Sequence, residues 1–146
     1  MLNPDSLFEL FDETTALFHH LKAAAEKTHR QGELSAARRG VMRSLRKHGP
    51  LTVPQLARLR PVSRQHIQTI VDPLVKDGLA SVETNPRHKR SKLIALTRKG
   101  ARVLEGMDRR ERRLLESTPF TISETAVRQA TRVLRQVRDQ LYAQHP

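Results

Sequence analysis

The sequence of 146 residues contains no cysteine and very few aromatic residues. Without cysteine the chain has no disulfide, no thiolate metal site and no thiol-based redox switch. Aromatic side chains make up only 3% of the residues, which counts against a single-strand-binding protein that stacks bases on aromatic rings. No apolar run approaches the roughly 18 residues of a membrane helix, and the N-terminus has no signal-peptide pattern. We therefore expect a soluble, cytoplasmic protein.

Acidic residues are also scarce relative to basic ones. Lys and Arg total 27 against 15 Asp and Glu, a formal net charge of +12. The surplus is uneven, because residues 1–30 carry a net charge of −2, residues 31–100 carry +11, and residues 101–146 carry +3. A surplus of this size, gathered in the middle of the chain, indicates a polyanionic partner, most simply nucleic acid. The length suits one domain with a modest core, which homodimerisation would enlarge.

A helix with one apolar and one polar face is predicted over Ser63–Leu79. Ser63 is a suitable N-cap, and Gly78 supplies a C-terminal stop. The apolar stripe has helical spacing and consists of Ile67, Ile70, Val71 and Leu74. The opposite face holds Arg64, Gln65, Gln68, Thr69, Asp72 and Lys76. Arg, Gln and Thr can hydrogen-bond to base edges and phosphates, and a helix fits the major groove. Taken alone, the segment is better explained as an ordinary amphipathic helix, but its neighbours favour a DNA-reading one.

Two predicted helices precede this segment. One spans about 36–47 with Ser35 as its cap and a row of arginines, Arg38, Arg39 and Arg43, on its outward face. These arginines either contact the DNA backbone or are simply solvated. The other spans about 53–59 and begins with a capping box of Thr52 and Gln55. A short helix, a tight connection and a polar second helix form the helix-turn-helix arrangement.

The hydrophobic period changes after Gly78, where two strands are predicted over 79–84 and 92–96. Asn85-Pro86 is a turn signal, and the tip between the strands reads Arg87-His88-Lys89-Arg90-Ser91. A two-stranded ribbon with a cationic tip after a recognition helix is a wing, whose natural target is the minor groove or the adjacent phosphates. A solvated basic loop is the alternative, and the position in the chain favours DNA contact.

Long amphipathic helices are predicted at both ends of the chain. The first reaches about Thr28, and either Asn3-Pro4 or a capping box of Ser6 and Glu9 begins it. A helix of about 98–115, capped by Thr97, is followed by a last helix with a Thr121–Glu124 capping box. The last helix carries a seam with steps of three and four, formed by Val127, Ala130, Leu134, Val137 and Leu141. The seam fits either an intramolecular core or a second subunit, and we favour a dimer.

No catalytic constellation is found, so we expect a protein that is not an enzyme. Neither a His-Glu-x-x-His motif, a glycine-rich phosphate loop nor a nucleophile elbow is present. His19 and His20 are adjacent and point about 100° apart on a helix, so they cannot share one metal ion. We expect no cofactor and no metal.

Taken together, these segments resemble the MarR family, the multiple-antibiotic-resistance regulators. The resemblance spans nearly the whole chain and is most specific over 34–100. The matching motifs are Leu34-Ser35 with Val41-Met42 and Leu45, Gly49 to Ala57, Ser63 to Leu79, Asn85 to Ser91, and Leu96 to Gly100. Two departures stand out. His88 replaces an Asp that commonly orients a wing arginine in the family, which leaves Arg90 as the first choice for the groove. Pro73 lies inside the recognition helix and should bend it beyond the base-reading turns.

The resemblance implies a homodimeric transcription regulator that binds a pseudo-palindromic operator in double-stranded DNA. Such regulators often repress, and many are released by a small anionic or phenolic effector. No residue of this sequence identifies such a ligand site, so the ligand-binding residues are unknown. The alternatives are a sequence-independent architectural or RNA-binding protein and an adaptor that has lost DNA binding.

The predicted fold class is mainly α (α+β): a winged helix-turn-helix with a two-stranded β wing, flanked by N- and C-terminal dimerisation helices. We predict a single domain with a DNA-binding lobe over 31–100 and dimerisation helices over 1–30 and 101–146. The predicted DNA-binding residues are Ser63, Arg64, Gln65, Gln68, Thr69, Arg87, Lys89, Arg90 and Lys92.

Overall fold

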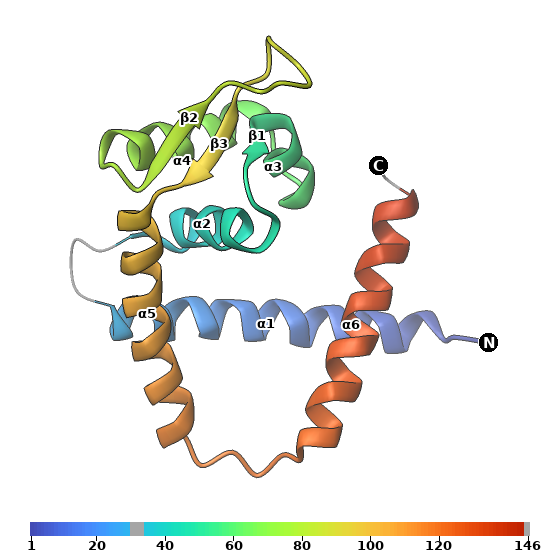
Figure 1. The fold of residues 1–146 in the computed structure, drawn as a ribbon. Helices are drawn as coiled ribbons and strands as arrows, with labels where there is room; N and C mark the ends of the chain where they lie inside the picture. The colour runs from blue at the N-terminus through green and yellow to red at the C-terminus, as the bar shows by residue number, and fades with distance from the viewer. Residues whose placement is uncertain (30–33, 145–146) are drawn as a thin grey trace. The chain divides into compact units, whose positions relative to one another are not determined.

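A computed structural model describes residues 1–29 and 34–144 of the chain. The order of elements is α1 (Pro4–Thr28), α2 (Ala36–His48), β1 (Leu51–Thr52), α3 (Val53–Leu59), α4 (Arg64–Lys76), β2 (Ala80–Glu83), β3 (Leu93–Leu96), α5 (Arg98–Ser117) and α6 (Glu124–Gln144) (Figure 1). They form two compact units, residues 1–114 and the segment from Leu115 onward. The mainly helical, winged helix-turn-helix architecture is confirmed. The lobe boundary predicted at residue 31 lies outside the described residues.

The helices of the helix-turn-helix begin at the predicted capping residues. Ser35 caps α2 by accepting a hydrogen bond from the Arg38 amide at 3.3 Å. In α3 the capping box is complete, because Thr52 accepts from the Gln55 amide at 3.3 Å and donates its own amide to the Gln55 side chain at 2.8 Å. Each of these side chains satisfies an amide that the first turn leaves without a helical partner. Local sequence therefore sets where each helix starts.

The core of the first unit lies between α2, α3, α4, the sheet and the start of α5. The predicted apolar stripe of α4 is buried throughout, which fixes the opposite face of that helix toward solvent. The largest fully buried side chains are Met42, Leu56, Ile67, Leu74, Leu104, Met107, Val41 and Val71. Burying each of these side chains contributes about 1.5–3 kcal/mol relative to leaving it exposed. The core thus holds α4 in one orientation.

The sheet has three antiparallel strands in the order β1-β3-β2 (Figure 1). β2 and β3 form the predicted wing, with Glu83 opposite Leu93 at its open end. β1 pairs Leu51 with Ile94 and Thr52 with Leu93, and the sequence analysis did not predict it. A two-residue strand carries too little alternation to be recognised, and its second residue, Thr52, is also the cap of α3.

The C-terminal end of α4 is joined to the first turn of α5. The amides of Gly78 and Leu79 close a Schellman motif on the last turn of α4, with Gly78 at φ 72°. The hydroxyl of Thr97 donates to the Gly78 carbonyl at 2.6 Å and accepts from the Gly100 amide at 3.0 Å, so Thr97 caps α5 as predicted. α4 itself continues through Pro73 into its last turn, and the bend expected there stays a prediction.

The two end helices carry apolar side chains that the described chain leaves exposed. α1 begins with Asn3 as its cap and Pro4 in its first turn, which decides between the two predicted starts. α6 is capped by Ser123, whose hydroxyl accepts from the Ala126 amide at 3.1 Å, so the predicted Thr121–Glu124 capping box is wrong. Neither helix has a buried residue in the described chain. Their exposed large apolar residues are Phe8, Leu17, Phe18 and Leu21 in α1, and Val127, Val133, Leu134, Leu141 and Tyr142 in α6.

Candidate nucleic-acid interface

The polar face of α4 is open to solvent along its first two turns. Ser63 is exposed and caps the helix, with its hydroxyl oxygen accepting from the His66 amide at 3.0 Å. The predicted base-reading residues are all exposed, namely Arg64, Gln65, Gln68 and Thr69. The first turn contains no acidic residue, so nothing there repels a phosphate from the positive end of the helix. This face is free to enter a groove.

Two of these side chains make hydrogen bonds within α4. The Gln68 amide nitrogen donates to the carboxylate of Asp72 at 2.6 Å, one turn further along the helix. The Thr69 hydroxyl donates to the His66 carbonyl at 2.6 Å. Gln68 keeps its amide oxygen free for an acceptor role, and Thr69 keeps its methyl group and its lone pairs. Asp72 thus holds the Gln68 side chain in one orientation before any base is present.

The loop of the wing consists of two successive tight turns between β2 and β3. The side-chain oxygen of Asn85 accepts a hydrogen bond from the Arg87 amide at 3.1 Å. The backbone carbonyl of Asn85 accepts one from the His88 amide at 3.2 Å. The Ser91 amide then donates to the His88 carbonyl at 3.1 Å. Asn85 therefore acts as the turn residue that its identity predicts. The loop extends beyond the paired ends of both strands (Figure 1).

The wing cations are exposed and have no acidic partner in the described chain. These residues are Arg87, Lys89, Arg90 and Lys92. No ion pair joins any of them to a carboxylate of residues 1–29 or 34–144. The structure thus places the predicted binding residues in two exposed groups, one on α4 and one in the loop that β2 and β3 carry. β2 packs against α4, so both groups belong to one lobe.

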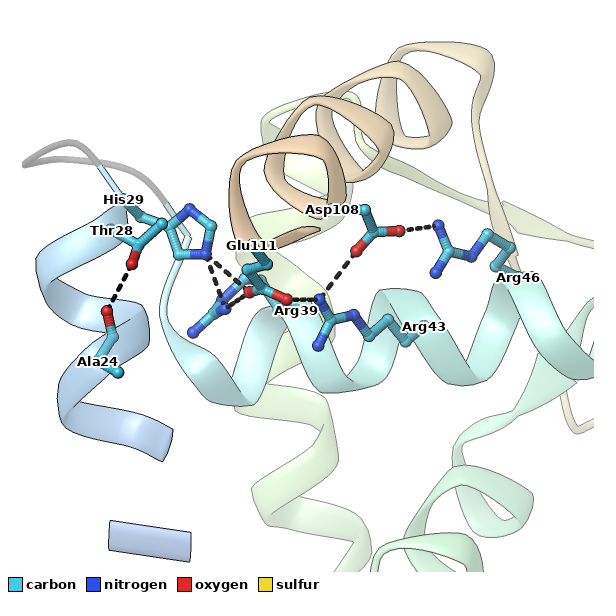
Figure 2. A network of polar contacts seen from close by, with 8 residues as sticks. All are labelled: Ala24, Thr28, His29, Arg39, Arg43, Arg46, Asp108 and Glu111. Carbon is cyan, nitrogen blue, oxygen red and sulfur yellow. Dashed lines mark hydrogen bonds and ion pairs between the residues drawn. The ribbon is translucent and has the colours of Figure 1, made fainter. Parts of the chain in front are cut away.

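Three of the four arginines of α2 are paired with carboxylates of α5, contrary to the sequence interpretation. Arg39 is only 5% exposed, and its Nη1 donates to Glu111 Oε1 at 2.6 Å. Arg43 Nη2 lies 2.8 Å from Asp108 Oδ1 and 2.5 Å from Glu111 Oε2. Arg46 Nη1 lies 2.5 Å from Asp108 Oδ2. Figure 2 shows these arginines pointing from α2 toward the two carboxylates of α5. The expectation of an outward arginine is therefore wrong for Arg39, which is buried, and Arg43 is partly exposed but paired with both carboxylates. For Arg38, which is partly buried, a contact with the DNA backbone stays a prediction.

His29, which follows α1, completes this network. Its Nε2 lies 2.9 Å from Glu111 Oε1 and 3.0 Å from Arg39 Nη1 (Figure 2). Burial would raise the pKa of Glu111, but hydrogen bonds from His29 and Arg43 and the charges of Arg43 and Arg39 lower it overall. Burial acts in the same direction on Asp108, and hydrogen bonds from Arg46 and Arg43 lower its pKa overall. The network ties α2 and the end of α1 to the middle of α5.

The sequence contains a signal for this network in the spacing of its charged residues. Arg39, Arg43 and Arg46 have the spacing of one helix face, and α2 contains no carboxylate to pair with them. Asp108 and Glu111 are three residues apart on α5 and so share a face as well. Which helix faces which other helix depends on the tertiary fold, and hydrophobic periodicity alone does not give that pairing.

Two further properties bear on the kind of protein. Within residues 1–29 and 34–144, no helix is long and apolar enough to cross a membrane. The same residues contain no group of three or more His, Asp or Glu side chains arranged to hold a metal ion.

Comparisons with known proteins match the winged helix-turn-helix fold described above. A model described as MarR family matches residues 21–91. An uncharacterised protein of Mycobacterium tuberculosis is 38% identical over 105 residues, which cover 68% of this chain and 73% of that protein. Among solved structures, a MarR family transcription regulator has 25% sequence identity to this chain and a TM-score of 0.76. The match covers 97% of this chain and 95% of the other.

A third similar protein is BpsR of Bordetella bronchiseptica, in a structure concerned with the regulation of its DNA binding by 6-hydroxynicotinic acid. BpsR is 20% identical, with a TM-score of 0.74, and the match covers 88% of this chain and 91% of BpsR. At that identity the likeness establishes the fold alone.

Proposed function

Because this chain belongs to the MarR family of transcription regulators, we propose that it binds a specific double-stranded DNA sequence as a homodimer. The role that we propose for it is that of a transcriptional repressor. The observation that carries the proposal is the pairing of an exposed polar face on α4 with an exposed wing whose cations have no carboxylate partner among the described residues. Elsewhere in the same lobe three of the four arginines of α2, Arg39, Arg43 and Arg46, are paired with carboxylates of α5.

The residues divide into two roles in this proposal. Arg64, Gln65, Gln68 and Thr69 read base edges in the major groove, since arginine and the amides suit the donor and acceptor patterns there. Arg87, Lys89, Arg90 and Lys92 hold the flanking minor groove and its phosphates, which adds affinity without reading the sequence directly. Ser63 keeps its cap and can donate its hydroxyl hydrogen to a phosphate.

The exposed apolar faces of α1 and α6 support the homodimer. Exposed residues such as Phe8 (65%) and Phe18 (61%) of α1, and Leu141 (51%) of α6, leave apolar surface that a second subunit would cover. Two-fold symmetry then places two copies of α4 in successive major grooves, about 34–36 Å apart, so the operator is pseudo-palindromic. The predicted division into a DNA-binding lobe over 31–100 and dimerisation helices at both ends belongs to the same proposal.

We also infer that a small molecule controls binding. The DNA binding of the structurally similar BpsR is regulated by 6-hydroxynicotinic acid. The α2–α5 network offers a physical link, because any ligand that moves α5 also moves the helix that packs under α4. The residues that would bind such an effector stay unassigned.

Footprinting on fragments of genomic DNA tests the proposed function. The expected result is a small set of protected sites, each with two inverted half-sites, at protein concentrations where other fragments are free. Uniform protection that follows only fragment length would identify a sequence-independent architectural protein instead. Absence of salt-sensitive affinity for any duplex would identify an adaptor that does not bind DNA.

A further inference from the structure

Arg60 is a half-buried cation that the described chain does not neutralise. It is the C-cap residue of α3, and its amide donates to the Leu56 carbonyl at 3.2 Å. Its guanidinium has no hydrogen bond or ion pair with residues 1–29 or 34–144. Burial lowers the pKa of Arg60, and no neighbouring charge or hydrogen bond opposes that effect. The side chain is therefore partly desolvated without compensation.

The guanidinium rests against Gly40 in the second turn of α2. A Cβ added at Gly40 would lie 2.5 Å from Arg60 Nη2 and 2.7 Å from Arg60 Cζ, so any other residue at position 40 would displace the guanidinium. Glycine inside a helix weakens that helix relative to alanine. α2 thus has a helix-weakening residue at the one place where Arg60 needs room.

Two buried or partly buried arginines nearby are held differently from Arg60. Arg39 and Arg43 lie on the same helix as Gly40, and both are held by Glu111. A desolvated charge without a partner destabilises a fold, and an opposite charge beside it offsets part or all of that cost. Binding sites are the places where proteins commonly retain such a destabilising feature. The charge of Arg60 is therefore available to an anion supplied from outside the chain.

Arg60 also occupies a particular place in the helix-turn-helix. It lies in the connection between α3 and α4, three residues before Ser63, the cap of the proposed recognition helix. The planar guanidinium matches the oxygens of a phosphate in a two-pronged hydrogen bond. We propose that Arg60 binds a backbone phosphate of the DNA beside the half-site that α4 reads. This inference rests on the proposed DNA-binding function and adds a contact that fixes the register of the lobe on the duplex.

The salt dependence of duplex binding tests the role of Arg60. Arg60→Met removes the charge and keeps the length of the side chain. Loss of one phosphate contact lowers the slope of log affinity against log salt by about 0.9 per subunit, and at about 0.15 M salt it weakens binding by about fivefold per subunit. The loss is the same for operator and random duplex. Arg102→Met, which removes an exposed arginine of α5, is the matched control and leaves the slope unchanged. An unchanged slope in Arg60→Met overturns the proposal.

Thermal unfolding separates this role from a structural one. Because the charge of Arg60 is uncompensated in the free protein, Arg60→Met melts at or above the wild-type temperature, while a lower melting temperature overturns the proposal. Gly40→Ala provides a second variant that keeps every charge but displaces the guanidinium. It weakens duplex binding in the same direction as Arg60→Met, and unchanged affinity would contradict the fit on Gly40.

Inorganic phosphate distinguishes DNA from a free anion as the source of the phosphate. Stabilisation of the wild type but not of Arg60→Met by inorganic phosphate, with equal salt slopes for both, would assign the site to a free anion and overturn the proposal. A wild-type protein without salt-dependent duplex affinity overturns both the proposed function and this role. Wild-type binding with an unchanged Arg60→Met slope overturns the role of Arg60 alone.

Discussion

Removing the charge of Glu111 should destabilise the protein strongly, because this carboxylate neutralises a buried arginine. Its partner Arg39 has a side chain only 6% exposed, and Glu111 itself is 25% exposed. Breaking a buried ion pair on one side costs about 3–5 kcal/mol, since the remaining charge stays desolvated. The partial exposure of Glu111 puts Glu111→Gln at the lower end, about 3 kcal/mol. That is a large part of the about 5–15 kcal/mol that stabilises a typical domain.

Urea unfolding at one fixed protein concentration measures this effect, because a dimer's apparent stability depends on concentration. Glu105→Gln is the control, since Glu105 is exposed on the same helix, and it should change the free energy of unfolding by less than about 0.5 kcal/mol. The double variant Arg39→Met/Glu111→Met removes both charges and should recover to within about 1 kcal/mol of the wild type. If Glu111→Gln unfolds like Glu105→Gln, the network is not a stabilising ion-pair cluster and our account of it is wrong.

Three further predictions follow from the same lobe. Since the pKa values of Asp108 and Glu111 are lowered in the folded protein, their contribution to stability is complete above about pH 5 and is lost as the pH falls below about 4; acid unfolding of Glu111→Gln should be less steep. Gly100→Ala places a Cβ against the Leu79 carbonyl oxygen and should lower the free energy of unfolding by about 1–3 kcal/mol. Thermal unfolding measures this loss, and an unchanged melting temperature would refute the close packing of α5 on the end of α4. Arg90→Ala should weaken binding to all duplexes and lower the salt slope by about 0.9 per subunit, whereas an unchanged slope would remove Arg90 from the wing contact.

The sequence predicts most of the lobe because its signals are local. Ser35, Thr52, Ser63 and Thr97 cap helices where their hydroxyls can accept an amide of the first turn, and the apolar stripe of α4 determines which face is buried. For α6 the capping-box pattern of Thr121 and Glu124 predicts the wrong start, because the hydroxyl of Ser123 is the one that accepts an amide of the first turn. Capping patterns two residues apart compete, and local sequence does not rank them.

The features that the sequence did not reveal depend on contacts between distant segments. Arginines at helical spacing read as a solvated face until α5 is known to supply Asp108 and Glu111 opposite them. The position of Arg60 against Gly40 likewise joins residues from two helices. Charge counting therefore overestimates the number of cations available to DNA, because several arginines of α2 form ion pairs with carboxylates of α5.

The most direct test of the account is an in vitro selection of duplexes by the wild type and by Gln68→Ala, from a random library at fixed salt. The wild type should select an inverted repeat, and Gln68→Ala should relax the preference at one base pair in each half-site, symmetrically, by about 1–3 kcal/mol. Selection of no repeat by the wild type, or the same selected sequence with both proteins, would contradict the assignment of α4 as the helix that reads DNA.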